Sequence, residues 1–241
     1  MRRFVPFLFT VLLATLICCT SANAAVIFSD TFESYPAGLS LPGLGSVWTV
    51  VQGTTLYNGS LYTGSVDLLG SGVFQNTICV TAGGADQCVD LSGSTPAPSG
   101  AKLETVQSLS FVPGTTYNLS FDLAGSQRGD TNTVVVGITN GVLAPVTFTK
   151  LTGDQFNPRT VIPFTVSAPV SGQLYFDNSS NINFTTTCGG GEFCGFDGAL
   201  LDNVSIDSVP EPATGSLFGI GFIGAALFAK ARRRRSSRNS A

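Results

Sequence analysis

The sequence predicts an all-β fold: an antiparallel β-sandwich, preceded by a signal helix and followed by a transmembrane helix. Three observations lead to this prediction. Runs of β-branched and aromatic residues with alternating polarity recur through the central part of the chain, which is typical of half-buried strands. Clusters of Gly, Pro, Asn and Ser interrupt these runs, as turns require. No comparable helical periodicity appears between them.

The predicted strands are spread over most of the central part of the chain. They cover residues 47–51, 103–111, 116–123, 133–138, 146–151, 160–166, 173–176 and 200–206. In the third strand, Tyr117, Leu119, Phe121 and Leu123 fall on one face, because successive side chains of a strand point to opposite sides. The Ser-, Pro- and Gly-rich segment 92–100 is predicted to be a loop, since neither side of it carries enough strands for a separate core.

The charges fall into three blocks. Residues 1–24 carry a net charge of +2, residues 25–209 carry four bases against fourteen acids, and residues 210–241 carry six bases against one acid. This order is typical of a chain that crosses a membrane. The acidic centre argues against a nucleic-acid partner. The sequence contains no histidine, which excludes Ser-His-Asp and Cys-His catalysis and histidine-ligated metal sites.

The first 24 residues have the pattern of a secretory signal peptide. Two arginines follow the initiating methionine, residues 4–19 are nearly all apolar, and Ala22 and Ala24 form an A-x-A cleavage site. A retained membrane anchor is the weaker interpretation, because the apolar run is short and ends in small polar residues. We therefore expect export through the Sec pathway and cleavage before Ala25.

The other end of the chain carries a tripartite signal over residues 209–235. It consists of a short motif, an apolar segment long enough to span a membrane, and a basic cluster that would remain in the cytoplasm. The motif is Val209, Pro210, Glu211 and Pro212; the predicted transmembrane helix is 213–229; the basic tail 230–235 holds Lys230, Arg232, Arg233, Arg234 and Arg235; and 236–241 is a polar tail. A plain C-terminal anchor is the alternative interpretation.

This tail resembles the PEP-CTERM sorting signal of Gram-negative bacteria, with Pro210-Glu211-Pro212 as the signature triplet. The resemblance implies recognition by exosortase from an inner-membrane intermediate and cleavage near the triplet. The body, residues 25–208, would then be attached to the cell surface or released into the extracellular matrix. The family accompanies exopolysaccharide production and biofilm formation.

The sequence between the two ends holds four cysteines: Cys79, Cys88, Cys188 and Cys194. In an exported protein, an even number of cysteines indicates disulfides. Pairing of Cys79 with Cys88 and of Cys188 with Cys194 would cross-link two glycine-rich loops, and the two other connectivities remain open. A zinc site is the weaker interpretation, because neither pair has the usual spacing of two intervening residues.

The body also resembles a known group of domains. The segments 89–94, 113–125 and 200–206, the last reading Leu-Leu-Asp-Asn-Val-Ser-Ile, are similar to galactose-binding-domain-like jelly rolls, in particular the bacterial "choice-of-anchor" surface domains. The resemblance covers about residues 47–207. It implies a sandwich like that of a carbohydrate-binding module.

Aromatic side chains are the first candidates for sugar contacts, because sugar sites combine an aromatic face with polar groups. Trp48, Tyr57 and Tyr62 are the candidate residues. Tyr57 and Tyr62 flank an Asn-Gly-Ser turn, which favours exposure. For Trp48, a position in the core is the competing interpretation.

A structural calcium ion is the one cofactor that the sequence suggests. Jelly rolls of this kind often hold calcium between the first and last strands, and calcium prefers oxygen ligands. The candidate ligands are Asp30, Glu33 and Asp202. The alternative is that Asp202 only makes local hydrogen bonds to the backbone.

Three classes of function follow from these observations. The leading one is an exported, exosortase-processed protein whose sandwich contacts extracellular polysaccharide. The second is a structural surface protein without a specific ligand. The third is a secreted glycoside hydrolase, which requires two carboxylates facing each other across a cleft. We expect no enzyme, because no nucleophile-base motif is present.

Overall fold

A computed structural model describes the chain in several stretches. These are residues 24–51, 55–57, 60–62, 64–70, 73, 79, 87–93, 101–126, 131–178 and 198–210, with only the backbone for 55–57 and 60–62. The body, residues 25–208, is one compact unit. The predicted transmembrane helix 213–229 and the basic residues after it lie outside the described stretches. Within those stretches, no helix combines the length and apolar character needed to cross a membrane.

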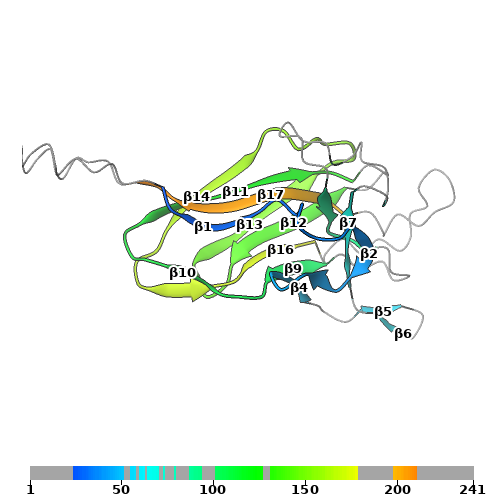
Figure 1. Ribbon diagram of the computed structural model, residues 1–241, viewed down its shortest axis with the longest axis horizontal. Coiled ribbons are helices and arrows are strands. Elements are labelled where there is room, and N and C mark those ends of the chain that lie inside the picture. Colours follow the sequence, from blue (N-terminus) through cyan, green and yellow to red (C-terminus); the bar gives the residue numbers. More distant parts are fainter. Residues whose placement is uncertain are drawn as a thin grey trace, which may run out of the picture. The chain divides into compact units, whose positions relative to one another are not determined.

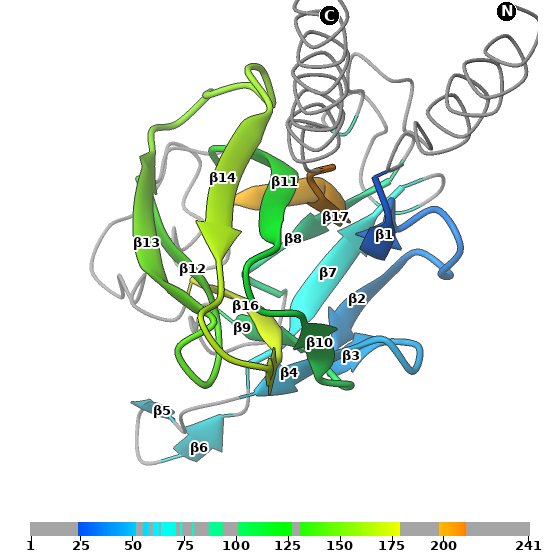
Figure 2. The same ribbon diagram turned by 90° about the vertical axis from the view of Figure 1, so that its left-hand side faces the viewer.

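The body contains two main sheets, in which all strand pairs are antiparallel (Figures 1 and 2). The seven-stranded sheet has the order β14-β11-β17-β8-β7-β2, and β1 lies beside β17. Its strands are β1 (Val26–Asp30), β2 (Gly38–Leu41), β7 (Val66–Leu69), β8 (Cys88–Asp90), β11 (Thr116–Ala124), β14 (Thr160–Thr165) and β17 (Leu200–Ser208).

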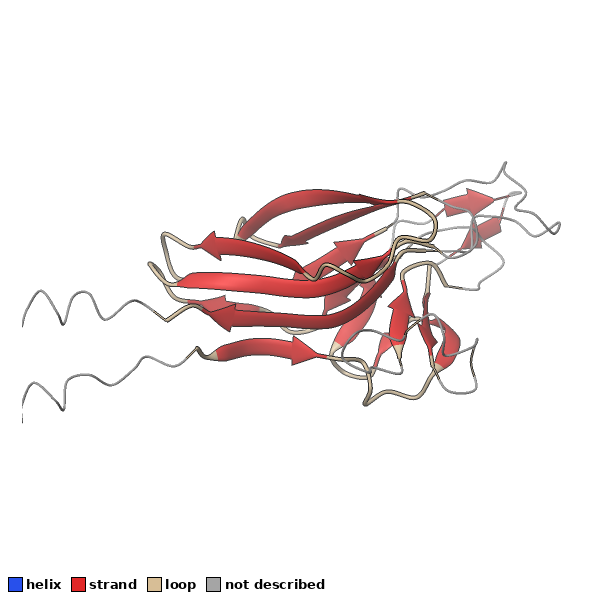
Figure 3. Cartoon of the chain, turned by 90° about the horizontal axis from the view of Figure 1, so that it is seen from above, coloured by secondary structure: helices blue, strands red, loops and turns tan. Residues whose placement is uncertain are grey.

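The second sheet has six strands in the order β13-β12-β16-β9-β4-β3. They are β3 (Gly43–Leu44), β4 (Trp48–Val51), β9 (Lys102–Thr105), β12 (Asn132–Ile138), β13 (Leu143–Lys150) and β16 (Leu174–Asp177). Two small pairs complete the fold: β5 (Thr55–Tyr57) with β6 (Ser60–Tyr62), and β10 (Leu109–Phe111) with β15 (Val170–Gly172). Figure 3 draws the described residues as strands and loops, which confirms the predicted antiparallel all-β class.

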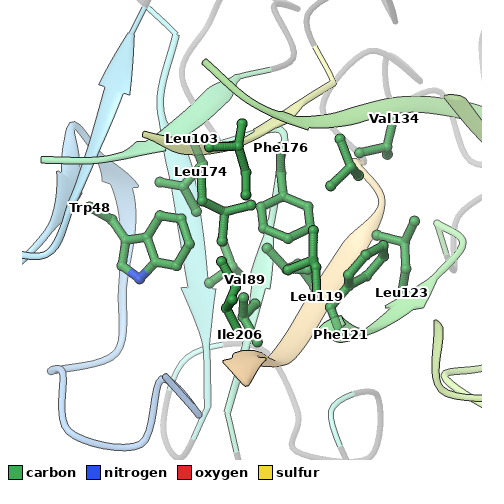
Figure 4. Packing of buried hydrophobic residues seen from close by; sticks show 14 of the residues in the cluster. Trp48, Val89, Leu103, Leu119, Phe121, Leu123, Val134, Leu174, Phe176 and Ile206 are labelled. Atoms are coloured by element: carbon green, nitrogen blue, oxygen red, sulfur yellow. The ribbon is translucent and has the colours of Figure 1, made fainter. Parts of the chain in front are cut away.

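The core lies between the two sheets (Figure 4). Phe121 of β11 and Phe176 of β16 meet edge to face across it, with ring centroids 5.1 Å apart. This arrangement is one that aromatic pairs favour. The predicted inward face of 116–123 is confirmed, because Tyr117, Leu119, Phe121 and Leu123 are all buried.

The predicted strand 103–111 is in fact two strands that belong to different pairings. β9 pairs with β4 and β16, whereas β10 pairs with β15. Pairing ends at Thr105, and the next residue, Val106, is 47% exposed. Its backbone N–H donates to the carbonyl oxygen of Val47 at 2.8 Å. The alternation of residues 103–111 runs on from β9 into β10 without interruption. The sequence pattern therefore does not show that the strand pairing changes between them.

β7 and β8 are not among the predicted strands. They have only four and three residues, and each carries a buried aspartate. Asp67 Oδ1 accepts a hydrogen bond from the backbone N–H of Ser40 at 2.6 Å. Asp90 Oδ1 accepts from the backbone N–H groups of Ser92 at 2.9 Å and Gly198 at 2.8 Å. These carboxylates accept hydrogen bonds from backbone N–H groups of loops. The hydrogen bonds offset the free-energy cost of burying a charged side chain inside a strand.

The two ends of the body meet in the seven-stranded sheet. β1 pairs with the second half of β17, so that Val26 lies opposite Asp207 and Asp30 lies opposite Val204. Just outside this pairing, the backbone N–H of Ser208 donates to the carbonyl oxygen of Ala25 at 2.8 Å. The backbone nitrogen of Ala25 in turn donates to Ser208 Oγ at 2.9 Å.

A disulfide joins Cys79 to Cys88, the first residue of β8. This is one of the two local pairings predicted from the sequence. Both cysteines are buried beside Leu69 of β7. The bond therefore holds Cys79 against the sheet. The second predicted pair, Cys188 and Cys194, lies outside the described residues.

Candidate functional site

The outer face of the six-stranded sheet carries two rows of side chains that run across its strands. Directly paired residues of neighbouring strands share one face, so the strand register defines these rows. The first row is Thr147, Val135, Asp177, Lys102 and Val51. The second row is Gly137, Tyr175, Glu104, Thr49 and Gly43. We call these residues the outer-face rows.

Tyr175 of β16 is the aromatic residue in the outer-face rows. It lies directly opposite Gly137 of β12, and a Cβ atom on Gly137 would come within 2.6 Å of the Tyr175 hydroxyl oxygen and 2.8 Å of Cζ. The missing side chain therefore lets the phenol ring lie down over β12. Burial raises the pKa of Tyr175; Lys102 opposes this effect, and Asp177 and Glu104 add to it. The hydroxyl thus stays protonated at neutral pH and can donate a hydrogen bond.

Charged side chains surround the Tyr175 ring. Lys102 Nζ lies 4.4 Å from the ring centroid, which is within the range of a cation–π contact. The same nitrogen lies 2.8 Å from Glu104 Oε2, and the Lys102 and Glu104 side chains are 26% and 10% exposed. Asp177 lies directly opposite Lys102 in the register. One ammonium group and two carboxylates are therefore grouped around one aromatic ring.

These residues form the floor of a pocket of about 390 Å³. The wall on one side comes from the end of β12, the turn after it and the start of β13. Lys102, Tyr175 and Asp177 lie on the floor of the pocket, and Ala144 and Pro145 lie in its wall. Pockets of this size that combine apolar walls with a few polar groups are typical of small-molecule sites.

Trp48 lies in the core, which corrects its assignment to a ligand-binding face. Its side chain is 1% exposed, and its ring contacts Phe28 and Phe176 with centroid distances of 5.3 and 6.2 Å. The indole N–H donates to Asp30 Oδ2 at 2.8 Å. A buried indole with a satisfied N–H is a packing residue. Tyr57 and Tyr62 lie in the β5–β6 pair, and their side chains lie outside the described part of the molecule.

Asp30 is a hydrogen-bond acceptor for the core, which corrects its assignment as a calcium ligand. Oδ1 accepts from the backbone N–H of Phe32 at 2.8 Å. Oδ2 accepts from Tyr35 Oη at 2.6 Å and from Trp48 Nε1 at 2.8 Å. With donors directed at both oxygens, a cation at this carboxylate would face their positive ends.

The other two predicted calcium ligands have different surroundings. The backbone N–H of Gln87 donates to Glu33 Oε1 at 3.1 Å, and Gln87 Nε2 donates to the Glu33 carbonyl oxygen at 3.2 Å. Gln87 Oε1 is buried and has no hydrogen-bond partner within the described part of the chain. A buried oxygen without a partner requires an explanation, and a bound ion is one possible explanation.

Asp202 of β17 is fully buried, with Oδ1 accepting from the backbone N–H of Asn203 at 2.6 Å. Burial raises the pKa of Asp202 to about 7, with contributions from the charges of Asp122 and Glu33, whereas the Asn203 N–H and Arg159 act in the opposite direction. Among the described residues, no three Asp, Glu, Cys or His side chains converge in the manner of a metal site. Calcium stays a prediction.

The residues of the pocket are not among the sequence candidates. A signal for Tyr175 was nevertheless present in the predicted strand 173–176. Since Leu174 and Phe176 are apolar and alternate with Tyr175, burial of those two residues directs Tyr175 to the outer face. Lys102 and Glu104 flank the buried Leu103 in the same way. What the sequence does not reveal is that β9 and β16 are neighbours.

Comparison with known families concerns the end of the chain. The family described as "PEP-CTERM protein-sorting motif" matches residues 208–235. The chain carries a PEP-CTERM sorting motif. This motif indicates an exported protein that is processed at the membrane and displayed on the cell surface, and it confirms the resemblance seen in the sequence. No curated protein matches the chain.

Several solved structures are similar to the chain at low sequence identity. The CBM22-1 and GH10 modules of a Clostridium thermocellum endo-1,4-beta-D-xylanase, complexed with xylohexaose, are 12% identical with a TM-score of 0.39; the match covers 78% of this chain and 29% of that one. The CBM22-1 xylan-binding domain of Paenibacillus barcinonensis Xyn10C is 12% identical with a TM-score of 0.36, and the coverages are 78% and 97%. A Cellvibrio mixtus carbohydrate-binding module in complex with cellotriose is 16% identical with a TM-score of 0.34, and the coverages are 77% and 99%.

Proposed function

We propose that this PEP-CTERM protein is a surface-displayed binding protein whose sandwich contacts extracellular polysaccharide. The observation that carries the proposal is the pocket over the outer-face rows, where an aromatic ring lies flat among charged side chains. A pyranose ring presents an apolar C–H face that stacks on an aromatic ring, and its hydroxyls require donors and acceptors nearby. The pocket supplies both.

Each side chain of the pocket has a distinct part in the proposed complex. The sugar would lie with its C–H face along Tyr175, while the apolar wall at Ala144 and Pro145 covers its edge. The Tyr175 hydroxyl can donate to hydroxyl oxygens, and the Asp177 carboxylate can accept from hydroxyl protons. The bonds to Asp177 are charge-assisted and therefore stronger than neutral ones, which helps to orient a sugar.

The substitution Tyr175→Ala tests the proposal. We expect it to weaken binding to the extracellular polysaccharide of the producing organism at least tenfold, because it removes the stacking surface. Binding is measured by affinity electrophoresis of the body, residues 25–208. Tyr175→Phe keeps the ring and loses only the hydroxyl, so we expect a smaller loss.

Val161→Ala serves as the control, because Val161 is 53% exposed and lies on β14 of the other sheet. Its binding should equal that of the unchanged protein. Equal binding by Tyr175→Ala would contradict the proposed site. If the unchanged body binds no polysaccharide, with or without calcium, the protein is a structural surface protein without a specific ligand. A hydrolase finds no support at Asp202, since this carboxyl is fully buried and out of reach of a substrate.

The proposal includes processing by exosortase. The segment 213–229 would hold the precursor in the inner membrane of a Gram-negative bacterium, with the basic tail in the cytoplasm. We expect Glu211→Ala to leave the tail uncut, because Glu211 is the acidic member of the signature triplet. Immunoblots of membrane and surface fractions would then detect the full-length precursor in the membrane. Ser216→Ala, which lies in the apolar segment, is the control, and normal release of Glu211→Ala would exclude this processing.

We also propose that one structural calcium ion stabilises the body. Glu33, Gln87 and Asp202 would hold it through two carboxylates and one amide oxygen, all of the oxygen type that calcium prefers. Two observations support this assignment. A cation would give the buried Gln87 Oε1 a partner, and it would offset the negative charge of the buried Asp202 carboxylate, whose pKa is raised. The ion would tie the segment after β1 to β17 and to the start of β8.

A further inference from the structure

The ring face of Tyr175 that a sugar would use is already covered in the free protein. One side of the ring lies over Gly137 of β12, where a Cβ atom would come within 2.6 Å of the hydroxyl oxygen. Lys102 reaches from β9, the strand on the other side of β16, and its Nζ lies 4.4 Å from the ring centroid. The phenol ring thus has the sheet on one side and an ammonium group over it.

The ammonium group is held at this position by a carboxylate. Glu104 Oε2 lies 2.8 Å from Lys102 Nζ, and the Glu104 side chain is only 10% exposed. Asp177 is the direct cross-strand partner of Lys102. An aromatic face and acidic neighbours are the features that bind an ammonium ion. The pocket therefore holds a cation supplied by its own chain.

We infer that Lys102 is the specificity-determining residue of the pocket: it caps Tyr175 until a sugar displaces it, and its pairing with Glu104 restricts the ligand to uncharged glycans. This inference rests on the proposed function. An uncharged pyranose can push the ammonium aside to the ring edge while the pair Lys102–Glu104 stays together.

A glycan with carboxylate groups meets a different situation. To accept such a ligand, Lys102 has to leave Glu104 and pair with the sugar carboxylate. Glu104 would then be left as a largely buried charge without its partner, beside a second negative charge, and breaking a buried pair in this way is strongly unfavourable. Asp177 adds further repulsion at short range. The pocket therefore discriminates against acidic glycans.

The test compares matched pairs of polysaccharides. Soluble glucan, mannan and galactan are each used as the neutral polymer and as a form whose primary hydroxyls are oxidised to carboxylates. Affinity electrophoresis of the body at one fixed calcium concentration measures binding of the unchanged protein, Lys102→Met and Glu104→Gln. Lys150→Met is the control, because it removes the same charge from β13.

We expect the unchanged body to bind at least one neutral polymer and to bind its oxidised form more weakly. Lys102→Met should bind the neutral polymer about two- to fivefold more tightly, which corresponds to an exposed cation–π contact. Glu104→Gln releases Lys102 and should gain binding to the oxidised form. Lys150→Met should change neither affinity.

The outcomes separate the inference from the proposed function. If the unchanged body binds only oxidised polymers, or if Lys102→Met binds the neutral polymer equally or more weakly, Lys102 is not a displaceable cap and the inference is overturned, while glycan binding stands. If the unchanged body binds no polymer of either form and does not bind the polysaccharide of the producing organism, the proposed function itself fails. Thermal unfolding of each variant verifies that the sandwich is intact.

Discussion

Replacing Trp48 with alanine is expected to lower the free energy of unfolding of the body by about 3–5 kcal/mol. The indole is 1% exposed and packs against Phe28 and Phe176. Its loss would leave a cavity between the sheets and would remove the N–H that donates to Asp30. For a body of this size, the corresponding fall in Tm is roughly 10 °C or more. Urea and thermal denaturation measure both quantities.

The outer-face residue Tyr175 provides the matched control for Trp48. Tyr175→Ala also deletes an aromatic side chain, but from a partly exposed position, so its effect on stability should be much smaller. Trp48→Ala should instead leave the polysaccharide affinity of the folded fraction unchanged. If Trp48→Ala keeps full stability but loses polysaccharide binding, the assignment of Trp48 to the core is wrong and Trp48 is a ligand-binding residue.

Calcium and pH are expected to act on the body through Asp202. The pKa of this carboxyl is about 7 in the folded protein, against an ordinary value of 3.8. Between these two pH values the folded state binds more protons than the unfolded state, so stability falls as the pH rises from about 4 to 7. In the presence of EGTA, we expect Tm to decrease by roughly 5–10 °C over this range, which corresponds to a few kcal/mol. Calcium at pH 8 should restore it, because a bound cation offsets the charge.

Two variants on β17 make this prediction specific. Asp202→Asn keeps the shape of the side chain and removes its charge, so both the fall with pH and the response to calcium should disappear. Asp207→Asn removes one charge from the same strand and should keep both responses, since Asp207 is not among the proposed calcium ligands and accepts a hydrogen bond from Ser205 Oγ at 3.3 Å. If EGTA and calcium leave the Tm of the unchanged body equal, the proposed ion is absent, and the part of the pH dependence that Asp202→Asn removes is due to the charge of this carboxyl itself.

The long strands of the fold could be predicted from the sequence because their pattern is local. In β11, Leu119, Phe121 and Leu123 alternate with polar residues, and burial on one side of a sheet requires this alternation. β7 and β8 could not be predicted in this way. β7 and β8 have only a few residues each and contain Asp67 and Asp90, whose loop partners are known only once the chain is folded.

The candidate site could be predicted only in part, for a related reason. Trp48 and Tyr175 are both aromatic residues on strands, and sequence alone does not tell which side of β4 is covered by the other sheet. The acceptor for the indole N–H is Asp30, eighteen positions earlier in the chain. The space over Tyr175 depends on Gly137, thirty-eight positions away and a neighbour only through strand pairing. The sorting motif, in contrast, is contiguous and could be recognised directly.

The pairing of β17 determines how a tethered body would carry mechanical load. The sorting motif begins at Ser208, the last residue of β17, so a pull from the cell surface enters the sandwich along this strand. β11 borders β17 on one side, and β8 and then β1 border it on the other, all antiparallel. Force along the strand therefore shears many backbone hydrogen bonds at once, instead of opening them one after another. In a body tethered through its C-terminal end, the strand next to the tether would also be the one whose extraction meets resistance from both sides.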